Sequence, residues 1–235
     1  MKLSDFSSDG VARTASRPYG PAGRDFNVSQ PLIRLFCLIA LFLLPHAAAA
    51  KEQVILALGD SLVAGYGLTD GEAFPAQLET ALAKQGIRAR VINGGVSGDT
   101  TAGGLQRVDW LMSDKPDLVI VELGANDGLR GIDPAETQRN LDGILTRMNE
   151  VGVRVLLAGM LAPPNLGREY GDEFNAIFPA LAKKHKVALY PFFLDGVVAD
   201  PELNLSDGLH PNAKGVSVIV QRILPHVVKQ LGAVE

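Results

Sequence analysis

The sequence predicts an α/β fold, a three-layer α/β/α sandwich around a five-stranded parallel sheet. From Lys51 onward, short apolar runs alternate with longer segments whose apolar residues recur at helical spacing. The short runs are apolar without polar alternation, which is typical of parallel strands buried on both faces. Right-handed connections between such strands place helices on both sides of the sheet.

The composition is that of a globular protein with room for one domain. Of 235 residues, 47% are hydrophobic and 20% are charged, and the formal net charge is −4. This weakly acidic balance excludes a basic surface for nucleic acid, so we expect no nucleic-acid partner. The single cysteine, Cys37, and the four scattered histidines show no metal-ligand spacing. We therefore expect neither a metal nor a cofactor.

The first fifty residues are expected to precede the fold. Residues 1–34 are rich in Ser, Gly, Pro and Arg, and an apolar run of about ten residues follows Arg34 before the alanines at 47–50. This pattern is typical of a secretory signal peptide, and the run is too short for a bilayer span. The alternative is an uncleaved anchor at a membrane interface. We predict a leader at 1–50, a domain at 51–235, no stable membrane span after cleavage, and a periplasmic or secreted bacterial protein.

The first elements of the domain are read from short patterns. Residues 54–58 form a continuous apolar run that predicts the first strand. Apolar residues at helical spacing predict a helix over 74–84, with Gly86 as its C-cap. A second strand is expected at 88–93, before a glycine-rich loop that extends to Gly98.

The remaining elements continue the alternation. Thr101 is expected to cap a helix that runs to about Met112, and a loop at 124–131 is expected after the third strand. Two helices are expected to open with a proline in the first turn. The predicted strands are 118–123, 153–158 and 187–190, and the predicted helices are 134–151, 173–185 and 211–231.

Two polar blocks follow the first two strands, where parallel sheets place their ligands. Gly-Asp-Ser-Leu at 59–62 puts Ser61 at a strand-to-helix turn, where a hydroxyl can project from the sheet edge. The same residues are also ordinary turn and capping chemistry. The loop at 93–101 carries glycines that can turn backbone N–H groups toward an anion, or can simply be flexible.

Two further blocks complete the set. Asn126, in Gly-Ala-Asn-Asp at 124–127, has a neutral amide that can donate to a developing oxyanion, although Asn-Asp-Gly also makes a good turn. In Asp-Gly-Leu-His-Pro at 207–211, Asp207 can accept from the ring of His210 and leave its other nitrogen free to act as a base. The alternative is that Asp207 only caps the following helix.

Together these blocks resemble the SGNH or GDSL hydrolases, and most closely the bacterial periplasmic arylesterases, acyl-CoA thioesterases and lysophospholipases. The motifs that carry the resemblance are Gly-Asp-Ser-Leu at 59–62, Ser-Gly-Asp-Thr at 97–100, Val-Glu-Leu-Gly-Ala-Asn-Asp-Gly-Leu-Arg-Gly at 121–131 and Asp-Gly-Leu-His-Pro-Asn at 207–212. The resemblance implies a flavodoxin-like SGNH hydrolase fold. It also implies Ser61 as nucleophile, His210 as base and Asp207 as its orienting carboxylate.

The resemblance further implies an oxyanion hole made by the N–H groups of Ser61 and Gly98 and the side-chain amide of Asn126. The Ser-Gly-Asp-Thr match favours Gly98 over Gly95 as the glycine donor. Asp60, beside the nucleophile, is expected to hold the turn rather than to react.

The expected reaction is hydrolysis of carboxylic esters or thioesters, including aryl esters, acyl thioesters and lysophospholipids, through an acyl-enzyme. Met160, Leu161 and Pro163 follow the fourth strand and are expected to bind the apolar part of the substrate, or else to be core and rim residues. The alternatives are a carbohydrate O-deacetylase on the same fold, a catalytically silent lipid-binding protein, and a nucleotide-binding module, which would lack a P-loop lysine.

Overall fold

The computed structural model describes residues 51–232, which contain one parallel sheet of five strands in the order β2-β1-β3-β4-β5. Every neighbouring pair is parallel, and Gly59 at the end of β1 lies opposite both Gly95 of β2 and Glu122 of β3. The predicted fold class is confirmed. The strands are β1 (Gln53–Gly59), β2 (Ala89–Gly95), β3 (Leu118–Glu122), β4 (Arg154–Ala158) and β5 (Ala188–Tyr190).

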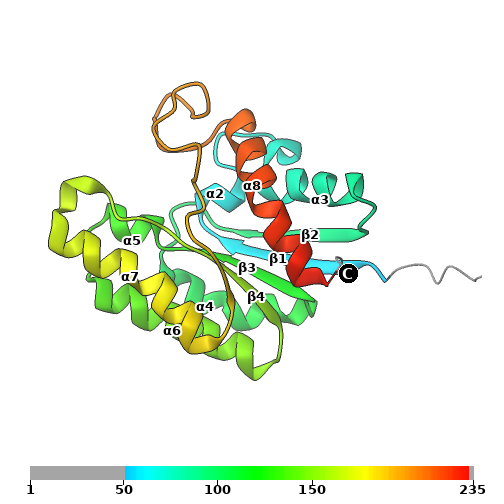
Figure 1. The fold of residues 1–235 in the computed structure, drawn as a ribbon, viewed down its shortest axis with the longest axis horizontal. Helices are drawn as coiled ribbons and strands as arrows, with labels where there is room; N and C mark the ends of the chain where they lie inside the picture. Colours follow the sequence, from blue (N-terminus) through cyan, green and yellow to red (C-terminus); the bar gives the residue numbers. More distant parts are fainter. Residues whose placement is uncertain (1–50, 233–235) are drawn as a thin grey trace, which may run out of the picture. The chain divides into compact units, whose positions relative to one another are not determined.

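Helices cover both faces of this sheet (Figure 1). Helices α3 and α8 pack together on one face, and α6 packs between α4 and α7 on the other. The helices are α2 (Ser61–Ala64), α3 (Phe74–Lys84), α4 (Thr101–Leu111), α5 (Ala125–Leu129), α6 (Pro134–Glu150), α7 (Arg168–His185) and α8 (Ala213–Leu231). Three short 3₁₀ turns lie at Asp70–Glu72, Met112–Asp114 and Pro164–Leu166.

The central strands are buried because they are apolar on both sides. Residues 55–58 of β1 and 118–121 of β3 have no exposed surface. Their side chains point alternately toward the two helical layers, so each strand stabilises both interfaces. At about 25 cal/mol per Å² of apolar area removed from water, this burial is the main source of the fold's stability.

The strand order reverses between β1 and β3, since β2 lies on one side of β1 while β4 and β5 lie beyond β3. At such a reversal the loops that leave the carboxyl ends of the two strands diverge, and a crevice opens between them. The blocks that begin at Gly59 and at Gly124 follow these two strands, so the topology brings them together.

Several predicted helix boundaries were wrong in detail. Thr100, and not Thr101, caps α4 through its hydroxyl, because Thr101 is buried and bonds to Asp127 instead. The cap of α8 is Asn212, which accepts from the two N–H groups of Lys214 and Gly215, so the helix does not open at Pro211.

Two other segments hold more helix than predicted. The expected loop at 124–131 contains the short helix α5, and α7 begins at Arg168 rather than at residue 173. The predicted leader at 1–50 lies outside the described residues. Within residues 51–232, no helix is both long and apolar enough to cross a bilayer.

Candidate active site

Ser61 lies at the turn where β1 passes into α2. Asp60 caps α2 by accepting the N–H of Leu62 at 2.9 Å, and Gly65 ends the helix in the left-handed conformation (φ 84°). As the first residue of α2, Ser61 has an N–H without a partner inside the helix, and this group stays available to an anion. Ser61 is 8% exposed, and it lines the cavity described below.

Asp207 and His210 lie in a loop between β5 and α8 whose two ends are hydrogen-bonded to each other. An antiparallel bridge joins Asn204 to Pro211, and the N–H of Leu205 donates to the carbonyl of His210 at 2.7 Å. The buried side-chain amide of Asn204 donates to two carbonyl groups at 2.7 Å, which ties the loop to the segment before it. The sequence pattern gave no indication of this role for Asn204.

The loop brings His210 between Asp207 and Ser61. Nδ1 of His210 lies 2.7 Å from Oδ2 of Asp207, and Nε2 lies 3.0 Å from Oγ of Ser61. Because an ionised carboxylate only accepts, Nδ1 carries the proton and Nε2 is left to accept from the serine hydroxyl. Backbone N–H groups of His210 and Leu209 also donate to Asp207, and with the imidazole ring they lower its pKa to about 2.

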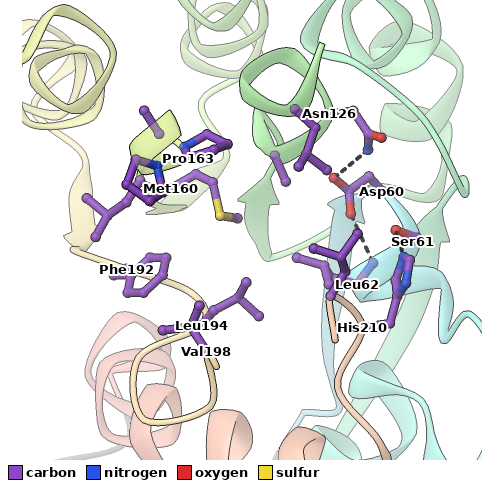
Figure 2. A pocket seen from close by; sticks show the side chains of 16 residues that line it. Asp60, Ser61, Leu62, Asn126, Met160, Pro163, Phe192, Leu194, Val198 and His210 are labelled. Atoms are coloured by element: carbon purple, nitrogen blue, oxygen red, sulfur yellow. Dashed lines mark hydrogen bonds between the residues drawn. The ribbon is translucent and has the colours of Figure 1, made fainter. Parts of the chain in front are cut away.

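Helix α5 carries Asn126 toward the nucleophile turn. Its Nδ2 donates to Oδ2 of Asp60 at 3.0 Å, as drawn in Figure 2. An amide nitrogen has two hydrogens, so this bond orients the group and leaves a second donor. Asp127, which has no exposed surface, accepts from Thr101 and Thr137 and thereby fixes α5 against α4 and α6.

Two carboxyl groups lie beneath the turn. Asp60 is 1% exposed and Glu122 is fully buried, and Oε2 of Glu122 accepts the N–H of Asp60 at 3.3 Å. Burial raises the pKa of Asp60 to about 6, against the hydrogen bonds from Leu62 and Asn126. Burial, and then the nearby charge of Asp60, raise the pKa of Glu122 well above its usual range.

The two candidate glycine donors differ in how their N–H groups are used. The N–H of Gly95 already donates to Oδ1 of Asn93 at 3.0 Å, and a Cβ at Gly95 would lie 2.2 Å from the backbone nitrogen of Ala64. Within residues 51–232, the N–H of Gly98 has no hydrogen-bond partner, and its carbonyl accepts from Arg130 at 2.7 Å. The N–H of Gly98 is therefore free to bind a ligand whereas that of Gly95 is not, although Gly98 does not line the cavity itself.

A cavity of about 410 Å³ opens beside Ser61 and His210 (Figure 2). Met160, Leu161 and Pro163 all line it, and Figure 2 shows Met160 and Pro163 on the wall across from Asp60 and Ser61. Met160 is buried, while Leu161 is 47% exposed at the rim. The cavity is also lined by apolar residues that the sequence interpretation did not single out: Leu62, Leu129, Pro164, Phe192, Leu194, Val198 and Leu209.

The comparison with protein families agrees with this site. The model of the GDSL-like Lipase/Acylhydrolase family matches residues 57–218, a segment that contains Ser61, Asn126, Asp207 and His210. The chain belongs to this family. It is an enzyme of the SGNH hydrolase type, and the predicted resemblance is confirmed.

Family relatives are similar along most of the described chain. An arylesterase of Vibrio mimicus is 42% identical over 201 residues, which cover 85% of this chain and all of the relative. The thioesterase 1/protease 1/lysophospholipase L1 of Escherichia coli is 42% identical over 173 residues, 73% of this chain and 81% of the relative. The crystal structure of AlinE4, an SGNH-hydrolase family esterase, is 53% identical with a TM-score of 0.66, and the match covers 77% of this chain and 97% of AlinE4.

One feature of this site was not predicted. The ring of Tyr66 packs against that of His210 in a tilted arrangement, with ring centroids 4.4 Å apart and planes 35° from parallel. Tyr66 lies two residues past α2, and no sequence pattern indicates this contact, because the loop that carries His210 is remote in the chain.

In residues 51–232 no group of three His, Cys, Asp or Glu side chains is placed to hold a metal ion.

Proposed function

We propose that this protein is a serine hydrolase that cleaves carboxylic esters and thioesters through an acyl-enzyme. The observation that carries the proposal is the hydrogen-bonded series Asp207, His210, Ser61 at one end of an apolar cavity. A serine hydroxyl becomes a nucleophile when a positioned base accepts its proton, and the 3.0 Å contact with Nε2 supplies that base.

In the first half of the reaction, Oγ of Ser61 attacks the acyl carbonyl carbon while Nε2 of His210 takes the hydroxyl proton. Asp207 stabilises the resulting imidazolium through Nδ1. The negative charge on the tetrahedral oxygen is stabilised by the N–H groups of Ser61 and Gly98 and by the amide of Asn126. His210 then returns the proton to the departing alkoxide or thiolate, and the acyl group remains on Ser61.

In the second half, water replaces the leaving group. His210 accepts a proton from water as the water oxygen attacks the acyl carbon, and a second tetrahedral intermediate forms in the same hole. Its collapse returns the proton to Oγ of Ser61 and releases the carboxylic acid. The same base serves both halves, so within the protein only Ser61 and His210 have to transfer a proton, while Asp207 stays ionised.

The cavity supports a substrate with an apolar acyl or aryl part. Met160, Leu161 and Pro163 provide the wall across from the nucleophile, and flexible Met160 suits substrates of varied shape. The substrates named for the relatives are aryl esters, thioesters and lysophospholipids. We propose the same classes here, ahead of sugar acetates, because no polar side chain lines that wall.

The test is hydrolysis of p-nitrophenyl esters over a range of acyl lengths, with the full chain and its Ser61→Ala variant. We expect activity in the wild type only, and an optimum beyond acetate if the apolar wall holds the acyl chain. An acetate optimum with poor longer esters would favour an O-deacetylase. A folded wild type that cleaves no ester or thioester would refute the enzyme proposal and favour a lipid-binding role.

A second variant tests the oxyanion hole. Asn126→Ala removes one donor, and we expect kcat to fall about 10²- to 10³-fold in a folded protein, as for other single oxyanion-hole donors. Retention of most of kcat would remove Asn126 from the site.

We also propose that the protein is exported to the periplasm or the medium. The support is the apolar run after Arg34 and the small residues before Lys51. Cell fractionation and the N-terminal sequence of the recovered protein test this. A product that keeps residues 1–50 in the cytoplasm would refute it.

A further inference from the structure

We infer that Arg107 is a positioning residue for the reaction, an inference that rests on the proposed function. Arg107 lies on α4, and its side chain is 19% exposed. It does not line the cavity. The sequence marks it only as one charged residue on a helix, and no step of the mechanism uses it.

The guanidinium of Arg107 contacts three separate segments at once. Nε donates to Oδ2 of Asp99 at 2.7 Å, Nη1 donates to the carbonyl of Gly94 at 2.6 Å, and Nη2 donates to the carbonyl of Gly59 at 2.8 Å. The planar fork of an arginine can serve three acceptors in fixed directions. All three nitrogens are therefore engaged in one geometry.

These acceptors lie where the chain leaves the sheet for the site. Gly59 ends β1, two residues before Ser61. Gly94 lies at the end of β2, and Asp99 directly follows Gly98. Arg107 thus links the turn that carries the nucleophile and its N–H to the loop that carries the second backbone donor of the proposed oxyanion hole.

The surroundings leave this link little freedom. A Cβ at Gly94 would lie 2.8 Å from the carbonyl oxygen of Ala57, so β2 approaches β1 closely at this point. The carbonyl of Gly59 also accepts the N–H of Val96 at 3.1 Å. The guanidinium of Arg107 is hydrogen-bonded to the ends of both strands and to the glycine loop, and it holds these three segments together.

A lysine cannot replace this arrangement. Its ammonium is a compact charge on a flexible stem, and it can stay with Asp99 or with one carbonyl but cannot reproduce the fork. The distance between Ser61 and the N–H of Gly98 would then be less well defined. A displacement of about 1 Å can cost about a hundredfold in rate, because the oxyanion forms only in the transition state.

Arg154, which is more exposed than Arg107, supplies a control at the opposite end of the sheet. Its Nε donates to the carbonyl of Asp117 at 3.0 Å, Nη1 to the carbonyl of Gln230 at 2.6 Å, and Nη2 to Oε1 of Gln53 at 3.3 Å. It therefore also links three segments through three nitrogens, but far from Ser61 along β1. Both Arg→Lys variants lose a link between three segments. Only the Arg107 variant is expected to disturb the alignment of the oxyanion donors.

The experiment compares kcat and KM of Arg107→Lys, Arg154→Lys and wild type on one p-nitrophenyl ester, with thermal unfolding of each. We expect Arg107→Lys to lower kcat about ten- to a hundredfold with KM within about threefold, and Arg154→Lys to keep kcat within about twofold. Equal kcat in the two variants, or a loss confined to KM, overturns the inference.

A second variant decides the matter if Arg107→Lys fails to fold. Asp99→Ala breaks only the link to the glycine loop and leaves both strand carbonyls bonded, and it is expected to lower kcat in the same sense. An unchanged kcat in folded Asp99→Ala overturns the inference. A wild type without esterase activity overturns the proposed function together with the inference, while an active wild type with an undiminished Arg107→Lys overturns the inference alone.

Discussion

Replacement of Asp60 by asparagine tests how the oxyanion donor is oriented. Asp60 is almost completely buried, and its two oxygens accept from two different groups, the N–H of Leu62 and the Nδ2 of Asn126. Asparagine has the same shape but only one accepting oxygen. In Asp60→Asn, one donor must therefore face the new amide nitrogen, and the Asn126 side chain is freer to move than a backbone N–H.

The size of the effect follows from the bond that is lost. A hydrogen bond to a charged group contributes about 1.5–3 kcal/mol, and each 1.4 kcal/mol is a factor of ten. If that energy keeps the amide of Asn126 in its transition-state orientation, kcat falls about ten- to a hundredfold at pH 8. This loss is smaller than that expected for Asn126→Ala, because the donor is still present.

The effect should depend on pH, because the pKa of Asp60 is raised to about 6. Only the ionised form offers two accepting oxygens, so the wild type loses its advantage over Asp60→Asn as pH falls through about 6. The contribution of Asp60 to folding stability has the opposite pH dependence. The folded protein binds the proton more tightly than the unfolded chain, so this group's contribution is complete below pH 3.8 and is lost as pH rises toward about 6.

The assay is kcat/KM of both proteins on one p-nitrophenyl ester between pH 5 and pH 8. The ratio of the two rates at each pH compares the wild-type carboxyl group with a neutral amide at position 60. We expect a ratio that is largest at pH 8 and smaller at pH 5. A folded Asp60→Asn with full kcat at pH 8, or a ratio that does not change with pH, refutes the reasoning.

Three further predictions concern the same region. Glu122→Gln keeps an oxygen that can accept the N–H of Asp60 in the turn after β1. Its free energy of unfolding relative to wild type should increase from pH 5 to pH 8 in urea titrations, because the raised pKa of Glu122 makes the wild type lose stability as pH rises above 4.5. Tyr66→Phe keeps the ring on His210 and should retain kcat, whereas Tyr66→Ala should lower it about two- to tenfold, because such ring pairs contribute about 0.5–1.5 kcal/mol. Gly95→Ala should lower the free energy of unfolding by at least about 2 kcal/mol in thermal or urea unfolding, because the new Cβ would meet the backbone of α2. Gly71→Ala is the control, since its Cβ has open space and the free energy of unfolding should change little.

Each of these has a result that contradicts it. For Glu122, a stability difference that is constant with pH would show that the residue is ionised in the fold. For Tyr66, equal activity of the Phe and Ala variants would show that the ring does not position His210. For Gly95, an alanine variant as stable as Gly71→Ala would show that the contact with α2 is easily relieved.

The sequence was most informative where local chemistry and position coincide. The helix at 74–84 was predicted with its exact bounds as the structure has them, because Phe74, Leu78 and Leu82 all face the core. Capping residues were less predictable. Thr100 and Thr101 have the same side chain, and only the buried carboxylate of Asp127, 26 residues away, decides that Thr101 is used elsewhere.

The pocket shows the same limit. Met160, Leu161 and Pro163 were named because they follow a strand that ends at the site. Phe192, Leu194 and Val198 line the same cavity, but they come from the long segment between β5 and α8, which has no periodic sequence signal. A residue of this kind is recognised only when the loop is seen to fold back.

The sequence by itself determined the parallel α/β fold and the family of the chain, because apolar strands and short polar motifs are local patterns with few structural solutions. It also placed Ser61, Asn126 and His210 in loops at one edge of the sheet. Only the tertiary structure decided how those loops are held: Asp60 on Asn126, Glu122 beneath Asp60, and Arg107 across two strand ends. These contacts join residues far apart in the chain, and their energies depend on burial and direction, which exist only once the chain has folded.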